Sequence, residues 1–148
     1  MSQRIRLLTI GKVKTSWIAE GCQEFTKRLS RGYNIEQVAL KPGTVKEEGE
    51  RILAALKKRH DLIVLLHDRG RPMTSPEFGA WLKHLRDQSQ DITFLIGGAY
   101  GVDERVKEKA QQVLSLSHMT FPHELCQLIF LEQLYRGFSI AAGSQYHH

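Results

Sequence analysis

The chain has 148 residues, of which 41% are hydrophobic and 25% are charged. This length suits one domain with a buried core and is too short for two. No apolar run approaches the roughly 20 residues needed to cross a bilayer, and the first residues lack the apolar segment of a secretory signal, so we expect a cytoplasmic protein that does not enter a membrane. The net charge of +5 favours a polyanionic partner, although the basic residues are dispersed along the chain.

Hydrophobic periodicity predicts strands and helices in alternation. The expected strands cover residues 4–10, 34–40, 62–66, 92–96 and 113–116, and the expected helices cover 16–32, 44–59, 103–110, 122–142 and a segment that begins at 75. The run 62–66 is continuously apolar, which is typical of a parallel strand covered on both faces. We therefore expect a single α/β domain over residues 1–148, with a mostly parallel sheet and helices on both faces.

Capping residues indicate where three of these helices begin. Ser16 can cap the first helix, and Ser75 can cap the third. Thr44 and Glu47 form a capping-box pattern at the start of the second. The three cations at 57–59 are interpreted as the solvated end of that second helix, where positive charge is electrostatically favourable.

The last predicted helix is too apolar for an element that packs on one sheet face alone. Its apolar side chains cover more than one stripe: Leu125, Leu128, Ile129, Phe130, Leu131, Leu134, Tyr135, Phe138 and Ile140. A second surface should therefore bury part of this helix. We expect that surface to belong to another copy of the chain, which predicts a homodimer through residues 122–142.

Ligands of open parallel sheets bind beyond the carboxyl ends of the strands. Three connections qualify here: the loop 67–72 after Leu66, the glycine cluster 97–101, and the uncharged, hydroxyl-bearing stretch 114–123. Backbone groups in such a stretch can hold a small ligand, but an ordinary connection between strand and helix explains it equally well. The paired glycines likewise suit either a tight turn or the close approach of a ligand.

Several signatures of cofactor binding and catalysis are absent from the sequence. The glycine cluster does not follow the G-x-G-x-x-G pattern, and no acidic residue stands about 20 residues later, which argues against NAD. The seven histidines do not pair with cysteines or carboxylates at ligand spacing, so we expect no metal. Nucleophile-elbow, Walker and H-E-x-x-H patterns do not occur. Cys22 and Cys126 are far apart and are interpreted as reduced core residues.

Four motifs in the second half of the chain follow one another in a specific order. They are Leu95-Ile96-Gly97-Gly98-x-x-Gly101, Leu114-Ser115-Leu116-Ser117-x-Met119-Thr120-Phe121-Pro122-His123, Glu132-Gln133-Leu134-Tyr135-Arg136 and Tyr146-His147-His148. Together they closely resemble the RlmH family, the bacterial 23S rRNA pseudouridine N3-methyltransferases of the SPOUT class. The amino end agrees, with Gly11-Lys12 after the first strand and the run 24–29, so the resemblance covers nearly the whole chain.

The resemblance implies a fold, a cofactor and an assembly that periodicity alone does not indicate. It implies a deep trefoil knot within roughly residues 62–148, a homodimer, and S-adenosyl-L-methionine held in the knot. The implied substrate is 23S rRNA within the large subunit or the assembled ribosome. The residues that match the cofactor-binding positions of the family are Leu66, Gly97, Leu116, Ser117, His118, Met119, Thr120 and Phe121.

Two positions depart from the usual pattern of the family. Gln127 stands where the family commonly has Arg, which leaves open whether a cationic contact to RNA phosphate exists there. The second residue after the tail tyrosine is variable in the family, often Lys or Arg, and is His148 here.

Transfer of a methyl group to N3 needs accurate positioning and a group that removes the N3 proton. Glu132 and His147 are the candidate proton acceptors, and Arg136 and Tyr146 are candidates for orienting the base or a backbone phosphate. A simple i, i+4 helix pair explains Glu132 and Arg136 equally well, and the tail could be a frayed terminus or the start of a purification tag. We expect the tail to fold over the methyl donor.

Two other functions are compatible with the same sequence features. Within the SPOUT class, the alternative is a methyltransferase that acts on tRNA or on another rRNA position. From a different class, the alternative is a non-enzymatic factor that binds the ribosome through the same basic α/β body. Charge does not separate these alternatives, because phosphate contacts position a protein without reporting sequence.

Overall fold

A computed structural model describes residues 3–57 and 59–147 of the chain, so Lys58 and His148 lie outside the described residues. In these residues five parallel strands form one sheet in the order β2-β1-β4-β3-β5. The strands are β1 (Arg4–Ile10), β2 (Asn34–Leu40), β3 (Leu62–Pro72), β4 (Ile92–Ile96) and β5 (Gln112–Ser115). The helices are α1 (Ser16–Ser30), α2 (Val45–Leu56), α3 (Ser75–Asp87), α4 (Glu104–Lys109) and α5 (His123–Ala141).

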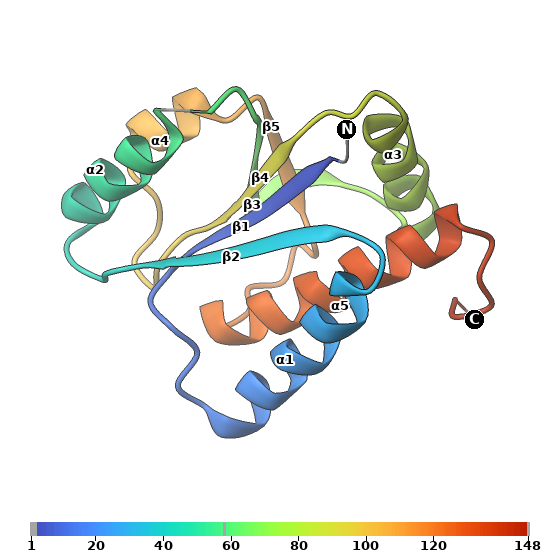
Figure 1. Ribbon diagram of the computed structural model, residues 1–148. Coiled ribbons are helices and arrows are strands. Elements are labelled where there is room, and N and C mark those ends of the chain that lie inside the picture. The colour runs from blue at the N-terminus through green and yellow to red at the C-terminus, as the bar shows by residue number, and fades with distance from the viewer. Residues whose placement is uncertain (1–2, 58, 148) are drawn as a thin grey trace.

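Helices cover both faces of the sheet, as predicted. Helices α1, α3 and α5 lie on one face, and α2 and α4 lie on the other (Figure 1). Successive side chains of each strand point to opposite faces of the sheet, so they pack in turn against the two helix layers. In the central strand, Phe94 packs in the core with Phe130 of α5, whereas Leu95 packs in the core with Ile52 of α2 and Val106 of α4.

Two of the predicted helix caps are displaced by one residue. Ser16 and Ser75 are the first helical residues, and Thr15 and Thr74 precede them in extended conformation. The Thr74 hydroxyl accepts the amide proton of Glu77 at 3.2 Å, which completes a capping box. The local sequence offered two adjacent hydroxyl residues in each case, and only the backbone conformation selects between them. The capping box at the start of α2 is confirmed.

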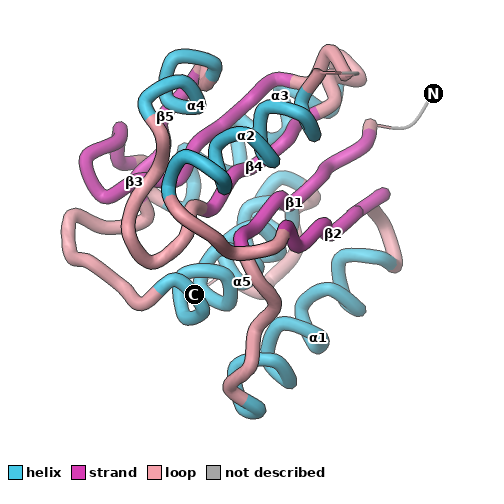
Figure 2. The backbone as a smooth tube through the Cα atoms, turned by 90° about the vertical axis from the view of Figure 1, so that its left-hand side faces the viewer, coloured by secondary structure: helices cyan, strands magenta, loops and turns pink. Residues whose placement is uncertain are grey.

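Strand β3 is longer than predicted and contains an interruption. It does not end at Leu66 but continues to Pro72, and both Leu66 and Arg71 pair with Leu114 of β5. The residues between the two pairs therefore leave the ladder as an excursion, visible beside the label β3 in Figure 2. At Gly70 the backbone of the excursion lies against β5. A Cβ atom there would lie 2.8 Å from backbone carbons of β5, so the close approach requires glycine.

The broad apolar surface of α5 is largely covered within one chain. Helices α1 and α3 pack on either side of it, and no residue of α5 is exposed. The helices approach closely at glycines: a Cβ atom on Gly21 would lie 2.8 Å from the Leu128 side chain, and one on Gly79 would lie 2.8 Å from the Gly137 carbonyl oxygen. The apolar width of α5 thus has an explanation without a partner, and the homodimer stays a prediction. None of the described helices combines the length and apolarity that a membrane span requires.

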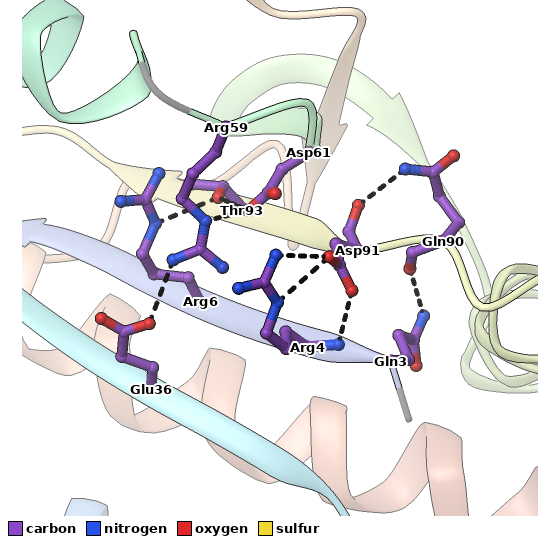
Figure 3. A network of polar contacts seen from close by, with 9 residues as sticks. All are labelled: Gln3, Arg4, Arg6, Glu36, Arg59, Asp61, Gln90, Asp91 and Thr93. Atoms are coloured by element: carbon purple, nitrogen blue, oxygen red, sulfur yellow. Dashed lines mark hydrogen bonds and ion pairs between the residues drawn. The ribbon is translucent and has the colours of Figure 1, made fainter. Parts of the chain in front are cut away.

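A polar network closes the amino ends of the strands (Figure 3). The prediction that Arg59 belongs to a solvated helix end is wrong, because α2 ends at Leu56 and Arg59 folds back over the sheet. Its guanidinium pairs with Glu36 at 3.1 Å and with Asp61 at 3.2 Å. Arg6 is buried beside it, and burial together with the nearby Arg59 charge lowers the pKa of Arg6.

Candidate active site

A cavity of about 680 Å³ opens at the carboxyl ends of β3, β4 and β5. The excursion of β3 and the connections that follow β4 and β5 meet there, together with the first turn of α5. The lining consists of residues 66–68, 96–99, 101–102, 116–117, 119–123 and 126. The volume lies within the range of roughly 300 to 1,000 Å³ that small-molecule sites occupy. The fold therefore provides a site of cofactor size at the sheet edge where ligands of open α/β proteins bind.

The cavity is lined by most of the residues that match cofactor-binding positions of the RlmH family. They are Leu66, Gly97, Leu116, Ser117, Met119, Thr120 and Phe121. His118 is not part of the lining, because its ring turns toward the β3 excursion. Its Nδ1 atom lies 2.9 Å from the carbonyl oxygen of Asp68. Since a carbonyl oxygen only accepts, this contact assigns the proton of a neutral His118 to Nδ1.

The glycine cluster is shaped both by its own turn and by its neighbours. Gly101 has φ +100°, a conformation that favours glycine, and forms an isolated bridge with Gly98. A Cβ atom on Gly97 would collide with the side chain of Val102, and one on Gly98 would lie 2.7 Å from Oε1 of the buried Glu48. The tight turn is therefore present, and both glycines also make room for neighbouring side chains of the protein, whereas the close approach of a ligand stays a prediction.

Asp68 joins two walls of the cavity, which the sequence analysis did not foresee. Its carbonyl oxygen accepts a hydrogen bond from the Ser115 hydroxyl at 3.2 Å, and its Oδ2 atom accepts one from the Thr120 hydroxyl at 3.2 Å. Its Oδ1 atom lies 3.1 Å from Nδ1 of His67. The sequence did not predict this role of Asp68, because Asp68 reaches residues 115–120 only through the register break in β3.

Cys126 is free and packs against the core, as expected, and it also borders the cavity. It lies in the first turns of α5, is partly buried and lines the cavity. Burial raises the pKa of the Cys126 thiol to about 11, so the group is a neutral thiol at physiological pH. Cys22, by contrast, is buried in the core as expected, and both cysteines are free.

The four candidate catalytic residues form one cluster at the carboxyl end of α5. The Arg136 guanidinium pairs with Glu132 at 2.7 Å, and the Tyr146 hydroxyl donates to the same carboxylate oxygen at 2.9 Å. Arg136 Nη1 lies 3.0 Å from Nδ1 of His147, and the guanidinium lies 4.9 Å from the centre of the Tyr146 ring. The i, i+4 ion pair between Glu132 and Arg136 is therefore present, and Tyr146 and His147 of the tail extend it into a network.

The electrostatics of this cluster strengthen the ion pair and keep Tyr146 neutral. The hydrogen bond from Arg136 to Glu132 raises the pKa of Arg136. Burial, followed by the hydrogen bond to the Glu132 carboxylate, raises the pKa of Tyr146. At neutral pH the cluster thus presents a paired carboxylate, a guanidinium and a phenol with its proton in place.

The cluster and the cavity do not meet within one chain. None of the four clustered residues lines the cavity. Glu132 follows His123 by nine residues of helix, a separation of about 13 Å along the α5 axis. The described tail packs against α5 and does not cover the cavity of its own chain. Gln127, which stands between the two regions, is buried and does not reach the surface.

Comparison with known proteins connects this fold and cavity to a single family. A family profile described as "Predicted SPOUT methyltransferase" matches residues 3–147. The chain is 44% identical over 144 residues to the ribosomal RNA large subunit methyltransferase H of Prochlorococcus marinus, an alignment that covers 97% of this chain and 95% of the relative. The protein of the same name from Geotalea daltonii is 40% identical over 153 residues, with 98% and 99% covered. That from Synechococcus sp. is 43% identical over 148 residues, with 97% and 94% covered.

These matches extend over nearly the full length of the chain and of each relative. They include the loops that line the cavity as well as the cluster on α5. The chain therefore belongs to the ribosomal RNA large subunit methyltransferase H (RlmH) family of SPOUT methyltransferases.

Proposed function

We propose that this protein uses S-adenosylmethionine to methylate N3 of a pseudouridine in 23S rRNA of the large ribosomal subunit, in the cytoplasm. Membership of the RlmH family supports the reaction class and the cofactor. The observation that carries the proposal is the cavity at the carboxyl ends of β3, β4 and β5, which is lined by seven of the eight residues matched to cofactor binding. Its volume and its closely approaching glycine backbone fit a nucleoside-sized ligand.

The cavity residues bind and orient the donor, and the chemistry follows from the donor itself. When bound, S-adenosylmethionine supplies an electrophilic methyl group on a sulfonium. Backbone groups of 97–98 and 116–121 are available to hold its polar parts, and Leu66 and Phe121 provide apolar walls. Since the displacement is in line, the contribution of the protein is mainly the relative placement of donor and acceptor.

Glu132 is the group that the geometry favours as the proton acceptor. The Nδ1 atom of His147 faces the guanidinium of Arg136, which only donates, so the lone pair of that nitrogen is occupied. A neutral His147 then carries its proton on Nε2 and presents a donor to the RNA. The Glu132 carboxylate accepts four hydrogen bonds, two from Arg136 and one each from Tyr146 and the side-chain amide of Gln133. It accepts the N3 proton in place of the 3.3 Å hydrogen bond from Gln133, while Arg136 and Tyr146 fix its orientation.

A homodimer supplies the proximity that a single chain lacks. The cluster of one protomer would stand against the cavity of its partner, so that the methyl donor and the proton acceptor come from different chains. Support comes from two large apolar side chains on the cavity loops, since Tyr100 is 89% exposed and Met119 is 76% exposed. Apolar groups of this size at the rim of a site are typical of surfaces that a partner covers. The deep trefoil knot within residues 62–148 is part of the same proposal.

The experiment that tests the function is mass spectrometry of 23S rRNA from a strain that lacks the gene. The expected result is the loss of one methyl group from a pseudouridine, with the mass restored when the wild-type gene is returned. Two controls should remain unchanged: the abundance of ribosomal proteins, measured from tryptic peptides, and the modifications of tRNA. A 23S rRNA that keeps all its methyl groups in the deletion strain would overturn the proposal.

A further inference from the structure

Asp68 is one of the two residues of the β3 excursion that line the cavity. It stands in the excursion of β3, where the ladder to β5 is interrupted. Its carboxylate accepts one hydrogen bond from Thr120 and approaches His67, and its side chain retains 38% of its exposure. The carboxylate is therefore held in a defined place but is not fully occupied by protein donors.

The charge of Asp68 has no counterpart elsewhere in the cavity wall. Among the described residues that line the cavity, Asp68 is the single carboxylate, and no Lys or Arg belongs to the lining. The titratable neighbours are the imidazoles of His67, His118 and His123 and the thiol of Cys126. With these groups neutral, the cavity presents one fixed negative charge to whatever occupies it.

The donor and the spent product of the proposed reaction differ in charge. The donor carries a sulfonium cation, and transfer of its methyl group to N3 leaves a neutral thioether, while the N3 proton passes to the base. The amino acid and nucleoside parts are the same in both molecules. A site that senses the sulfonium charge can therefore distinguish the two, whereas contacts to the shared parts cannot.

We propose that Asp68 is a specificity-determining residue that favours the sulfonium donor over the thioether product. This inference rests on the proposed function, since it concerns the same cavity. The charge acts through the space of the cavity: a sphere of 680 Å³ is about 11 Å across, close to the Debye length of about 8 to 10 Å. Most of the cavity is thus within about one Debye length of a charge on its wall.

The consequence is that methyl transfer itself weakens the hold of the protein on the product. Once the sulfonium charge is lost, the attraction to Asp68 disappears and the thioether leaves more readily. For a partly exposed charge pair, an effect of about fivefold on the ratio of the two dissociation constants is expected. The attraction is electrostatic, so the ratio should shrink as the salt concentration rises.

The test is calorimetric titration of S-adenosylmethionine and S-adenosylhomocysteine into the wild-type protein and three variants at pH 8, where imidazoles are ordinarily neutral. Asp68→Asn removes the charge with little change of shape. Thr120→Val removes the hydrogen bond to the carboxylate but keeps the charge. Asp87→Asn, at an exposed site on α3 that is not part of the cavity lining, is the charge-matched control. Thermal melting confirms that each variant is folded.

The expected outcome is that Asp68→Asn lowers the preference for the donor about fivefold and abolishes its salt dependence, while Asp87→Asn leaves both unchanged. Thr120→Val should weaken both ligands by a similar factor and keep the preference. If Asp68→Asn weakened both ligands equally, or neither, Asp68 would only organise the loop and the inference would be wrong. A folded wild-type protein that bound neither ligand would instead contradict the proposed function, a result distinguishable from the first.

Discussion

At the scale of single residues, the site depends on a few positions where a side chain is excluded or a polar group is held. Gly97 follows the central strand β4 and has no space for a Cβ atom beside Val102. Asp68 holds the 115–120 loop through hydrogen bonds that join two cavity walls. Neither role requires a rare amino acid. The paired glycines were visible in the sequence, whereas the position of Asp68 depends on the register break in β3 and was not.

The prediction at this scale concerns Gly97. Substitution Gly97→Ala should displace Val102 and the adjoining loop, because overpacking of this kind costs about 1–3 kcal/mol. Because this loop lines the cavity, S-adenosylmethionine binding should weaken about tenfold in calorimetry. The melting temperature should fall by several degrees while the protein still folds.

A second substitution tests whether the collision with Val102 causes the loss of affinity. The double variant Gly97→Ala, Val102→Ala removes the colliding side chain and should regain much of the lost affinity. Val102→Ala alone provides the baseline. Wild-type affinity in the Gly97→Ala single variant would show that the loop adjusts freely and that the packing argument is wrong.

At the scale of elements, hydrophobic patterns and turn residues predicted most bounds but missed the extent of β3. The bounds of β1, β2 and β4 were predicted correctly, and α5 was predicted to within one residue at each end. The excursion in β3 was missed, because the register between two strands depends on partners distant in sequence. The same register break places Asp68 beside residues 115–120. The sequence therefore predicted the cavity loops but not the hydrogen bonds of Asp68 that join them.

The prediction at this scale concerns the contact between the start of α1 and the start of α5. The Glu124 carboxylate accepts the amide protons of Thr15 at 3.1 Å and Lys14 at 3.2 Å. These hydrogen bonds, that from Thr15 first, lower the pKa of Glu124 below its usual value of 4.5. A lowered pKa in the folded state means that the contact stabilises the protein above pH 4.5 and is lost as the pH falls below that value.

Substitution Glu124→Gln should therefore reduce the thermal midpoint at pH 7 and have progressively less effect below pH 4.5. Differential scanning calorimetry across this range measures the difference between variant and wild type. Glu104→Gln, an exposed glutamate in the first turn of α4, is the matched control and should show little effect at any pH. A constant difference between Glu124→Gln and wild type at all pH values would mean that the charge of Glu124 is not involved.

At the scale of the whole molecule, the cavity and the Glu132 cluster, which we propose to be two parts of one active site, do not meet within one chain. The cavity lies at the carboxyl ends of the strands, and the Glu132 cluster lies farther along α5 with the tail folded against it. Sequence motifs identified both groups but contained no information on the distance between them. The proposed homodimer would resolve this separation, because each protomer would offer its cluster to the cavity of the other.

The measurement that tests this shared site most directly is methyl transfer to large-subunit rRNA by mixed dimers. One variant, Gly97→Val, carries a blocked cavity, and the other, Glu132→Ala, lacks the proton acceptor. Each alone should be inactive. Coexpressed in equal amounts, they should form mixed dimers in which one of the two sites is intact, and about a quarter of the wild-type activity should return. Coexpression that restores no activity, although the mixed dimers form, would contradict a site built from two chains.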